Sequence, residues 1–209
     1  AILYFSDAKL FQRFIGSINP LSACIIIIPA GFILLSYLLS KSWFSIYKKG
    51  NLKKRSKAVL LALVFVPVSI LVDIQVGFWK ELNVLFPESL LFYPAIGFMA
   101  EILFHVLPLA LLLFLFTSIF KNINQQKVIR ASMIIVSLLE PVYQTRLIFS
   151  SGHFPLWSSL LVLANLIAFN LSQLLVFKQH DFITLYSFRL VYYIIWHIVW
   201  GYFRLEWLF

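Results

Sequence analysis

Residues 89–120 read SLLFYPAIGFMAEILFHVLPLALLLFLFTSIF. A helix needs about 20 apolar residues to cross the hydrocarbon core of a bilayer, and this run is longer than that. It carries two ionisable side chains, Glu101 and His105, and two prolines, Pro94 and Pro108, at which the helix is expected to tilt, kink or break. This stretch therefore predicts a membrane-spanning helix that holds polar groups inside the membrane.

The amino-acid composition of the whole chain also predicts a membrane protein. Hydrophobic residues make up 62% of the 209 residues and charged residues only 12%, against roughly 45–50% and 25% in globular chains. A soluble fold could not cover so much apolar surface, whereas lipid accepts it. We predict an all-α polytopic membrane protein, a single transmembrane domain over residues 1–209, with about six spans at residues 20–40, 58–79, 89–120, 131–149, 157–177 and 182–203.

The basic residues predict the orientation of these helices. The net charge is +9, and Lys and Arg are concentrated in alternate loops, at residues 41–57, 121–130 and 178–181. The intervening loops, 80–88 and 150–156, contain only Lys80. Because cytoplasmic loops carry an excess of Lys and Arg, the first set is expected in the cytoplasm and both termini outside it. The expected location is a cell membrane, the cytoplasmic (inner) membrane of a bacterium.

The remaining sequence features limit the classes of partner. Residues 1–19 predict an amphipathic helix at the membrane interface, with Lys9 and Arg13 toward the headgroups. The basic loop 41–57 is interpreted as a topology signal that contacts anionic lipid, not as a nucleic-acid site. Cys24 is the only cysteine, which excludes an internal disulfide and a Cys/His zinc motif. The expected partners are membrane lipids and other membrane proteins.

Ionisable groups at membrane depth are the best indicators of function, because each costs at least about 2.5–3.5 kcal/mol to insert. Glu101 and His105 are four residues apart and so lie on one helix face. Together they could hold a metal ion or a water molecule. Alternatively, they form a satisfied pair that fixes helix packing.

Two further spans carry such groups. Glu140 is predicted to be a general base with Arg146 as its electrostatic partner; alternatively the two form an ion pair, or Arg146 extends outward to the interface. His197 is a candidate metal ligand or acid–base group, or a histidine packed among aromatic rings. Arg189 and Arg204 are interpreted as interfacial anchors and Asp73 as an interfacial cap. One or two of the three amide side chains in the fifth span are expected to hold helices together, among Asn165, Asn170 and Gln173.

Three segments resemble motifs of the CPBP family of intramembrane proteases, which includes CAAX-processing and bacteriocin-processing enzymes. LEPVYQTR, at 139–146, resembles the family's Glu-Glu-x-x-x-Arg motif, with Glu140 as one glutamate and Arg146 displaced. SSLLVLANL, at 158–166, resembles the Phe-x-x-x-His motif, with Leu161 and Asn165 in place of the Phe and His. WHIVWG, at 196–201, resembles the His-x-x-x-Asn/Asp motif, with His197 retained and Gly201 replacing the last residue.

This resemblance covers roughly residues 131–203. In that family the motifs converge on a water-filled pocket in which a glutamate activates water. The resemblance implies a diverged or inactive member, or one that recruits Glu101 and His105 to complete its site.

Two functions follow as hypotheses. The first is an intramembrane hydrolase that acts on a membrane-embedded or lipid-linked peptide, without a cofactor or with a divalent metal ion, in which Glu140, His197, Glu101 and His105 converge as the catalytic residues. The alternative is a non-catalytic small subunit or scaffold of a larger membrane complex. A haem or pigment bound by His105 and His197 is a third interpretation.

Overall fold

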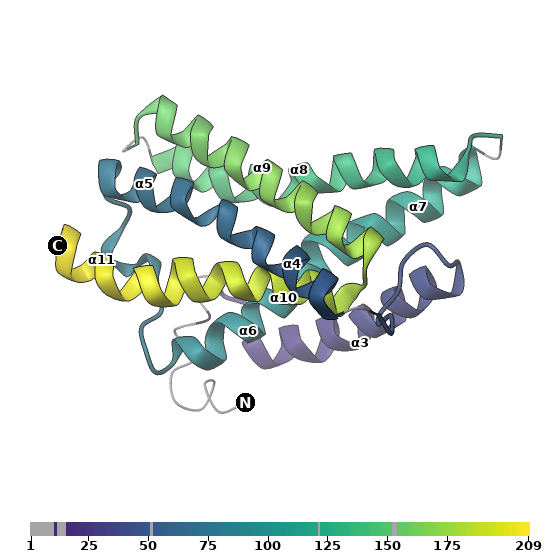
Figure 1. Cartoon of the computed structure of the whole chain (residues 1–209), viewed down its shortest axis with the longest axis horizontal. Helices are drawn as coiled ribbons and strands as arrows, with labels where there is room; N and C mark the ends of the chain where they lie inside the picture. The colour runs from purple at the N-terminus through teal and green to yellow at the C-terminus, as the bar shows by residue number, and fades with distance from the viewer. Residues whose placement is uncertain (1–10, 12–15, 51, 121, 152–153) are drawn as a thin grey trace.

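The chain folds into a helical bundle whose helices run roughly along the long axis of the molecule (Figure 1). The computed structural model describes residue 11 and residues 16–50, 52–120, 122–151 and 154–209, without the side chains of residues 147–151. The predicted interfacial helix at residues 1–19 lies almost entirely outside the described residues. The described part is 82% helical and has no strands, which confirms the predicted all-α class.

The helices are α3 (Pro20–Ser40), α4 (Leu52–Leu60), η1 (Leu61–Val64), α5 (Val66–Val76), η2 (Lys80–Leu82), α6 (Ser89–Ala100), η3 (Glu101–Val106), α7 (Leu107–Ile119), α8 (Gln125–Ser151), α9 (Leu156–Gln179), α10 (Phe182–Tyr193), η4 (Ile194–Trp200) and α11 (Gly201–Leu208). Several of them follow one another without a turn. Segments η3 and η4 are π-helical insertions within longer helices.

Five helices in the described residues are long and apolar enough to cross a membrane: Pro20–Ser40, Leu52–Val76, Ser89–Ile119, Leu156–Gln179 and Phe182–Leu208. These indicate a membrane protein. The remaining predicted span corresponds to α8, which is 27 residues long but more polar, so the predicted number of six is not confirmed. The second span begins at Leu52, earlier than expected, and ends where Gly77 adopts a left-handed conformation with φ of 61°.

A glycine allows α3 to approach the third span closely. A Cβ at Gly31 would lie only 2.7 Å from Cδ1 of Ile102, and Ile102 is 1% exposed. Small residues at helix interfaces permit such contacts between membrane helices. Gly31 thus sets the distance between α3 and the segment that carries Glu101.

Replacing Gly31 with leucine is expected to destabilise the bundle by about 1–3 kcal/mol, because Ile102 has no free space into which to move. The measurement is the free energy of unfolding in mixed detergent–SDS micelles. Ile33→Leu is the matched control on the same helix, because Ile33 is 69% exposed. Equal stabilities of the two variants would contradict the close contact.

A buried ion pair between Arg204 and Asp73 joins α11 to α5. Arg204 donates from Nε to Oδ2 of Asp73 at 2.7 Å and from Nη2 to Oδ1 at 2.8 Å. Trp200 donates to the same carboxylate at 2.6 Å, and Arg204 also donates to the carbonyl oxygen of Phe78 at 2.8 Å. Arg204 and Asp73 are both 0% exposed, so the interpretation of Arg204 as an interfacial anchor was wrong. Asp73 does accept the Phe78 N–H just after α5, which is the expected action of a cap.

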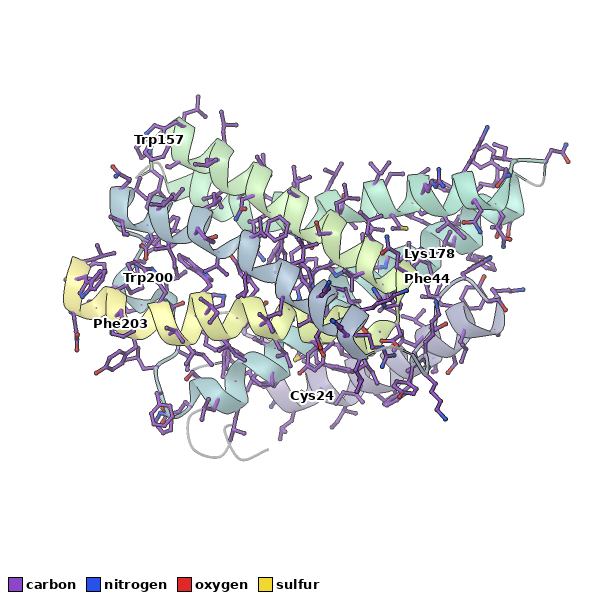
Figure 2. All side chains as sticks on the ribbon, in the orientation of Figure 1. Cys24, Phe44, Trp157, Lys178, Trp200 and Phe203 are labelled. Carbon is purple, nitrogen blue, oxygen red and sulfur yellow. The ribbon has the colours of Figure 1, made fainter. Side chains whose placement is uncertain are left out.

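The loop after α3 is tied to the turn between α9 and α10. Lys178 donates to the carbonyl oxygen of Trp43 at 2.8 Å, and its ammonium lies 5.2 Å from the ring centre of Phe44. Figure 2 shows Lys178 and Phe44 next to each other at this turn. Phe182 donates its backbone N–H to Ser45 at 2.9 Å. The basic loop is therefore part of the folded bundle.

Three apolar clusters form the core of the described residues, and polar groups lie between the two larger ones. Ile102 belongs to the first cluster and Phe188 to the second. Glu101 and Arg189 are their direct sequence neighbours and are 0% and 1% exposed. The fold thus brings ionisable side chains together where neither lipid nor water reaches them.

Candidate functional site

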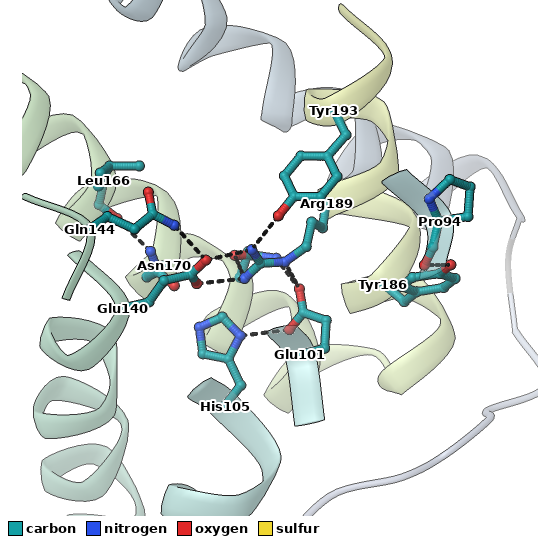
Figure 3. A network of polar contacts seen from close by, with 11 residues as sticks. Pro94, Glu101, His105, Glu140, Gln144, Leu166, Asn170, Tyr186, Arg189 and Tyr193 are labelled. Atoms are coloured by element: carbon teal, nitrogen blue, oxygen red, sulfur yellow. Dashed lines mark hydrogen bonds and ion pairs between the residues drawn. The ribbon is translucent and has the colours of Figure 1, made fainter. Parts of the chain in front are cut away.

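Arg189, on α10, lies at the centre of a buried polar cluster (Figure 3). Its Nε donates to Oε1 of Glu101 at 2.5 Å. Its Nη1 and Nη2 donate to Oε1 and Oε2 of Glu140, each at 2.7 Å. The guanidinium therefore binds Glu140 through two parallel hydrogen bonds, the strongest geometry for an arginine–carboxylate pair, and binds the second carboxylate through Nε.

Neutral side chains complete the hydrogen bonding of the two carboxylates. Gln173, on α9, donates to Oε1 of Glu101 at 2.5 Å and accepts from Nη2 of Arg189 at 3.2 Å. Gln144 donates to Oε1 of Glu140 at 2.9 Å. Gln173 thus holds helices together, as expected. Asn165 does the same between α9 and the second span, through Phe65 and Ser69, whereas Asn170 bonds to its own helix at Leu166.

The predicted pairing of Glu101 with His105 is confirmed. Nδ1 of His105 lies 2.6 Å from Oε2 of Glu101, and both side chains are 0% exposed. A carboxylate accepts a hydrogen bond from Nδ1–H, which leaves the lone pair of the neutral imidazole on Nε2. Nε2 of His105 is buried and has no hydrogen-bond partner among the described residues. Within the pair, this nitrogen is the atom free to bind something else.

Both residues of this pair lie in the π-helical segment η3. The backbone N–H of Leu107 bonds to the carbonyl of Ile102, five residues back. Pro108 follows, and a proline lacks the N–H that an α-helix would use at that point. Single π-turns occur frequently at functional sites, so the weakened helix predicted near Pro108 takes the form of a π-turn that carries the candidate residues.

The cluster combines two carboxylates, one guanidinium and one imidazole. The carboxylates of Glu101 and Glu140 both bind the guanidinium of Arg189, and Glu101 also holds His105. An uncompensated charge is costly in a low-dielectric interior, so the shared guanidinium allows the two carboxylates to be buried together.

His197 lies outside this hydrogen-bonded cluster. Its Nδ1 lies 2.8 Å from Oδ1 of Asn83, and its ring stacks on Tyr93 with centroids 4.5 Å apart. Its ring contacts the ring of Tyr193, and the hydroxyl of Tyr193 accepts a hydrogen bond from Arg189 of the cluster at 3.1 Å. Three of the four predicted site residues thus lie together, and the fourth is packed among aromatic rings. The catalytic roles assigned to all four stay predictions.

The partner predicted for Glu140 was wrong. Arg146 is exposed on α8, whereas Glu140 is paired with Arg189. Arg189 had been interpreted as an anchor, yet it is 1% exposed. One signal could have revealed it: two glutamates at membrane depth require a cation at the same depth, and Arg189 lies within a predicted span.

The described residues offer no ready site for a metal ion. They contain no group of three or more His, Cys, Asp or Glu side chains placed to hold a metal ion. Between the carboxylates of Glu101 and Glu140 lies a guanidinium, whose positive charge opposes a second cation. The Nδ1 atoms of His105 and His197 are engaged by different partners, Glu101 and Asn83.

No protein-family model matches the chain, and no curated protein or solved structure is significantly similar to it. Function is therefore inferred from the geometry of the buried cluster around Arg189.

Proposed function

We propose that the chain is an intramembrane hydrolase in which His105, positioned by Glu101, is the acid–base group, and that its substrate is a membrane-embedded or lipid-linked peptide. One observation carries this proposal: Nε2 of His105 is buried without a partner, while Nδ1 is held by Glu101. A buried polar atom without a partner calls for an explanation such as a bound water molecule or a catalytic role. A carboxylate that orients an imidazole is the arrangement used in catalytic triads.

The chemistry assigned to the pair is general acid–base hydrolysis. Nε2 of His105 takes a proton from water as the water oxygen attacks the acyl carbon of the scissile bond. The same nitrogen returns the proton to the leaving amine as the C–N bond breaks. Glu101 stabilises the imidazolium that forms between these two steps.

Glu140 supports the site in this proposal and is not the base. Both of its carboxylate oxygens accept hydrogen bonds from Arg189, and one also accepts from Gln144. Both oxygens of this carboxylate are thus engaged within the cluster, which leaves the role of base to Nε2 of His105. Glu140 is also the residue through which the chain resembles the CPBP proteases, so the proposal moves the water-activating role from that glutamate to His105.

The proposed setting is the cytoplasmic membrane of a bacterium. We take α8 as a sixth span, so that the basic loops 41–57, 121–130 and 178–181 face the cytoplasm and both termini lie outside. Glu101 and His105 have no exposed surface. The described conformation is therefore a closed state, and helices must separate to admit a peptide.

The test is cleavage of membrane peptides in ¹⁸O-labelled water by the purified chain in proteoliposomes. Hydrolysis places one ¹⁸O in each new carboxyl terminus, which mass spectrometry detects. His105→Gln is expected to lower the rate of labelling by about 10²–10⁴-fold, the usual contribution of a general base. His180→Gln, in the loop between α9 and α10, is the control and should retain the rate.

A specific observation favours the second candidate, a non-catalytic subunit or scaffold. The carboxylates of Glu101 and Glu140 are both paired with one guanidinium, as expected of a cluster that only holds helices together. This function predicts no labelled termini with the wild-type chain and only a change in stability for His105→Gln. Labelling that His105→Gln leaves unchanged would likewise contradict the assignment of His105.

A further inference from the structure

Two hollows adjoin each other around Arg55, where the second span begins. The first has a volume of about 240 Å³ and is lined by Lys48, Lys49, Lys54, Arg55, Gln179 and His180. The second has a volume of about 410 Å³ and lies between α4 and α10, where its lining includes Leu52, Val59, Leu60 and Ile183. Arg55 borders both. A cationic hollow and a mainly apolar groove thus lie on either side of one shared residue, Arg55.

Asp181 links the backbone and the side chains around the cationic hollow. It accepts the backbone N–H groups of Lys48 at 2.8 Å and Thr184 at 2.9 Å, and it forms an ion pair with Arg55. Burial alone would raise the pKa of Asp181, but the hydrogen bonds from Thr184 and Lys48 and the charge of Arg55 outweigh it and keep the pKa below its usual value. Asp181 therefore stays charged at neutral pH and neutralises Arg55.

Three cations of the hollow are then left for a ligand. Lys48, Lys49 and Lys54 are exposed, and no acidic residue lines the hollow beside them. The Arg55 side chain is 13% exposed and stacks at 4.7 Å on the ring of Tyr47. Three exposed lysines thus line one hollow, which suits a phosphate group carrying negative charge.

The adjoining groove supplies a place for a hydrocarbon chain. Leu52, Leu60 and Ile183 are 74%, 53% and 48% exposed. They belong to helices α4 and α10, both of which begin spans at this end of the bundle. A cationic hollow beside a mainly apolar groove between α4 and α10 matches the polarity of a phospholipid, which has a charged headgroup and an apolar tail.

We propose that this composite hollow is a binding site for one anionic phospholipid, with its headgroup phosphate on Lys48, Lys49 and Lys54 and one acyl chain along the groove between α4 and α10. Basic pockets between membrane helices are known to bind such headgroups. The groove explains why a lipid fits better than a soluble phosphate, which would leave the apolar half unused. This inference does not depend on the proposed hydrolase activity.

The test is native mass spectrometry of the full chain, purified in non-ionic detergent and titrated with dioleoyl-phosphatidylglycerol or dioleoyl-phosphatidylcholine. One phosphatidylglycerol molecule is expected to be retained in preference to phosphatidylcholine. The triple variant Lys48→Gln, Lys49→Gln, Lys54→Gln is expected to bind phosphatidylglycerol at least about tenfold more weakly, since each cation near an anionic headgroup adds to the attraction.

The matched control removes the same charge elsewhere, with Lys41→Gln, Lys57→Gln and Lys127→Gln, and should change the affinity less than about threefold. Equal losses in the two triple variants would show diffuse attraction and overturn the site. Equal retention of phosphatidylcholine would also overturn it. Displacement of the lipid by millimolar inorganic phosphate would assign the hollow to a free anion instead.

A Ser187→Trp variant, which fills the groove, should weaken lipid binding. Unchanged binding in this variant would contradict the proposed position of the acyl chain.

Discussion

Arg189→Met is expected to lower the free energy of unfolding by about 3–5 kcal/mol, the usual effect of removing one partner from a buried ion pair. The variant leaves the carboxylates of Glu101 and Glu140 facing each other without a cation, at 0% and 2% exposure. Methionine has a similar length and an apolar side chain, so the main change is the loss of charge. The measurement is equilibrium unfolding in mixed detergent–SDS micelles.

Two further variants make this result specific. Arg146→Met removes an exposed arginine from α8 and should change the stability by less than about 0.5 kcal/mol. Combining Arg189→Met with Glu101→Gln and Glu140→Gln removes all three charges and should restore part of the loss, because no unpaired ion then stays buried. A loss for Arg189→Met no larger than that for Arg146→Met would show that the cluster does not support the fold.

Asp73→Asn is expected to destabilise the protein by roughly 3 kcal/mol, because it leaves the guanidinium of Arg204 buried without its counter-ion. The shape of the side chain is almost unchanged, so packing around Trp200 is preserved. The effect should be largest in α11 and the segment after α5, since Arg204 joins them through Asp73 and the Phe78 carbonyl. Hydrogen–deuterium exchange should rise there first, before the rest of the bundle.

Glu206→Gln is the control, because Glu206 is an exposed carboxylate on α11, the helix that carries Arg204. Its exchange pattern and its stability should equal those of the wild type. Exchange that rises uniformly over the bundle in Asp73→Asn would mean that the pair does not act locally. The double variant Asp73→Asn, Arg204→Met should be less destabilised than the sum of the single changes, since the two residues share one interaction.

Much of the helical arrangement could be predicted from the sequence. Span boundaries follow from the length of apolar runs against a fixed bilayer thickness, which is why Pro20–Ser40 agrees with its prediction at both ends. The start of the second span was missed. Residues 52–57 are rich in Lys and Arg, and hydropathy assigned them to a loop, whereas the structure continues the helix through them at the membrane face. Four of these residues border the proposed lipid site: Leu52, Lys54, Arg55 and Ser56.

Part of the candidate site could likewise be predicted from the sequence. The pairing of Glu101 with His105 could be predicted, because four residues of helix bring two side chains onto one face whatever the rest of the fold does. The cost of inserting glutamate into hydrocarbon likewise identified Glu140 as a residue of interest. Both inferences use only local geometry and solvation, and these are properties of the sequence.

The tertiary structure alone decided which groups from different helices meet. It paired Glu140 with Arg189 instead of Arg146, brought Gln173 between them, and placed His197 beside Asn83. Contacts between helices depend on how each helix is rotated and at what angle it crosses its neighbours. A side chain six residues along one helix can therefore point away from a carboxylate, while one on another helix, 49 positions on, binds it directly. The spacing of residues along the chain does not determine how each helix is rotated, because that rotation depends on how apolar faces pack.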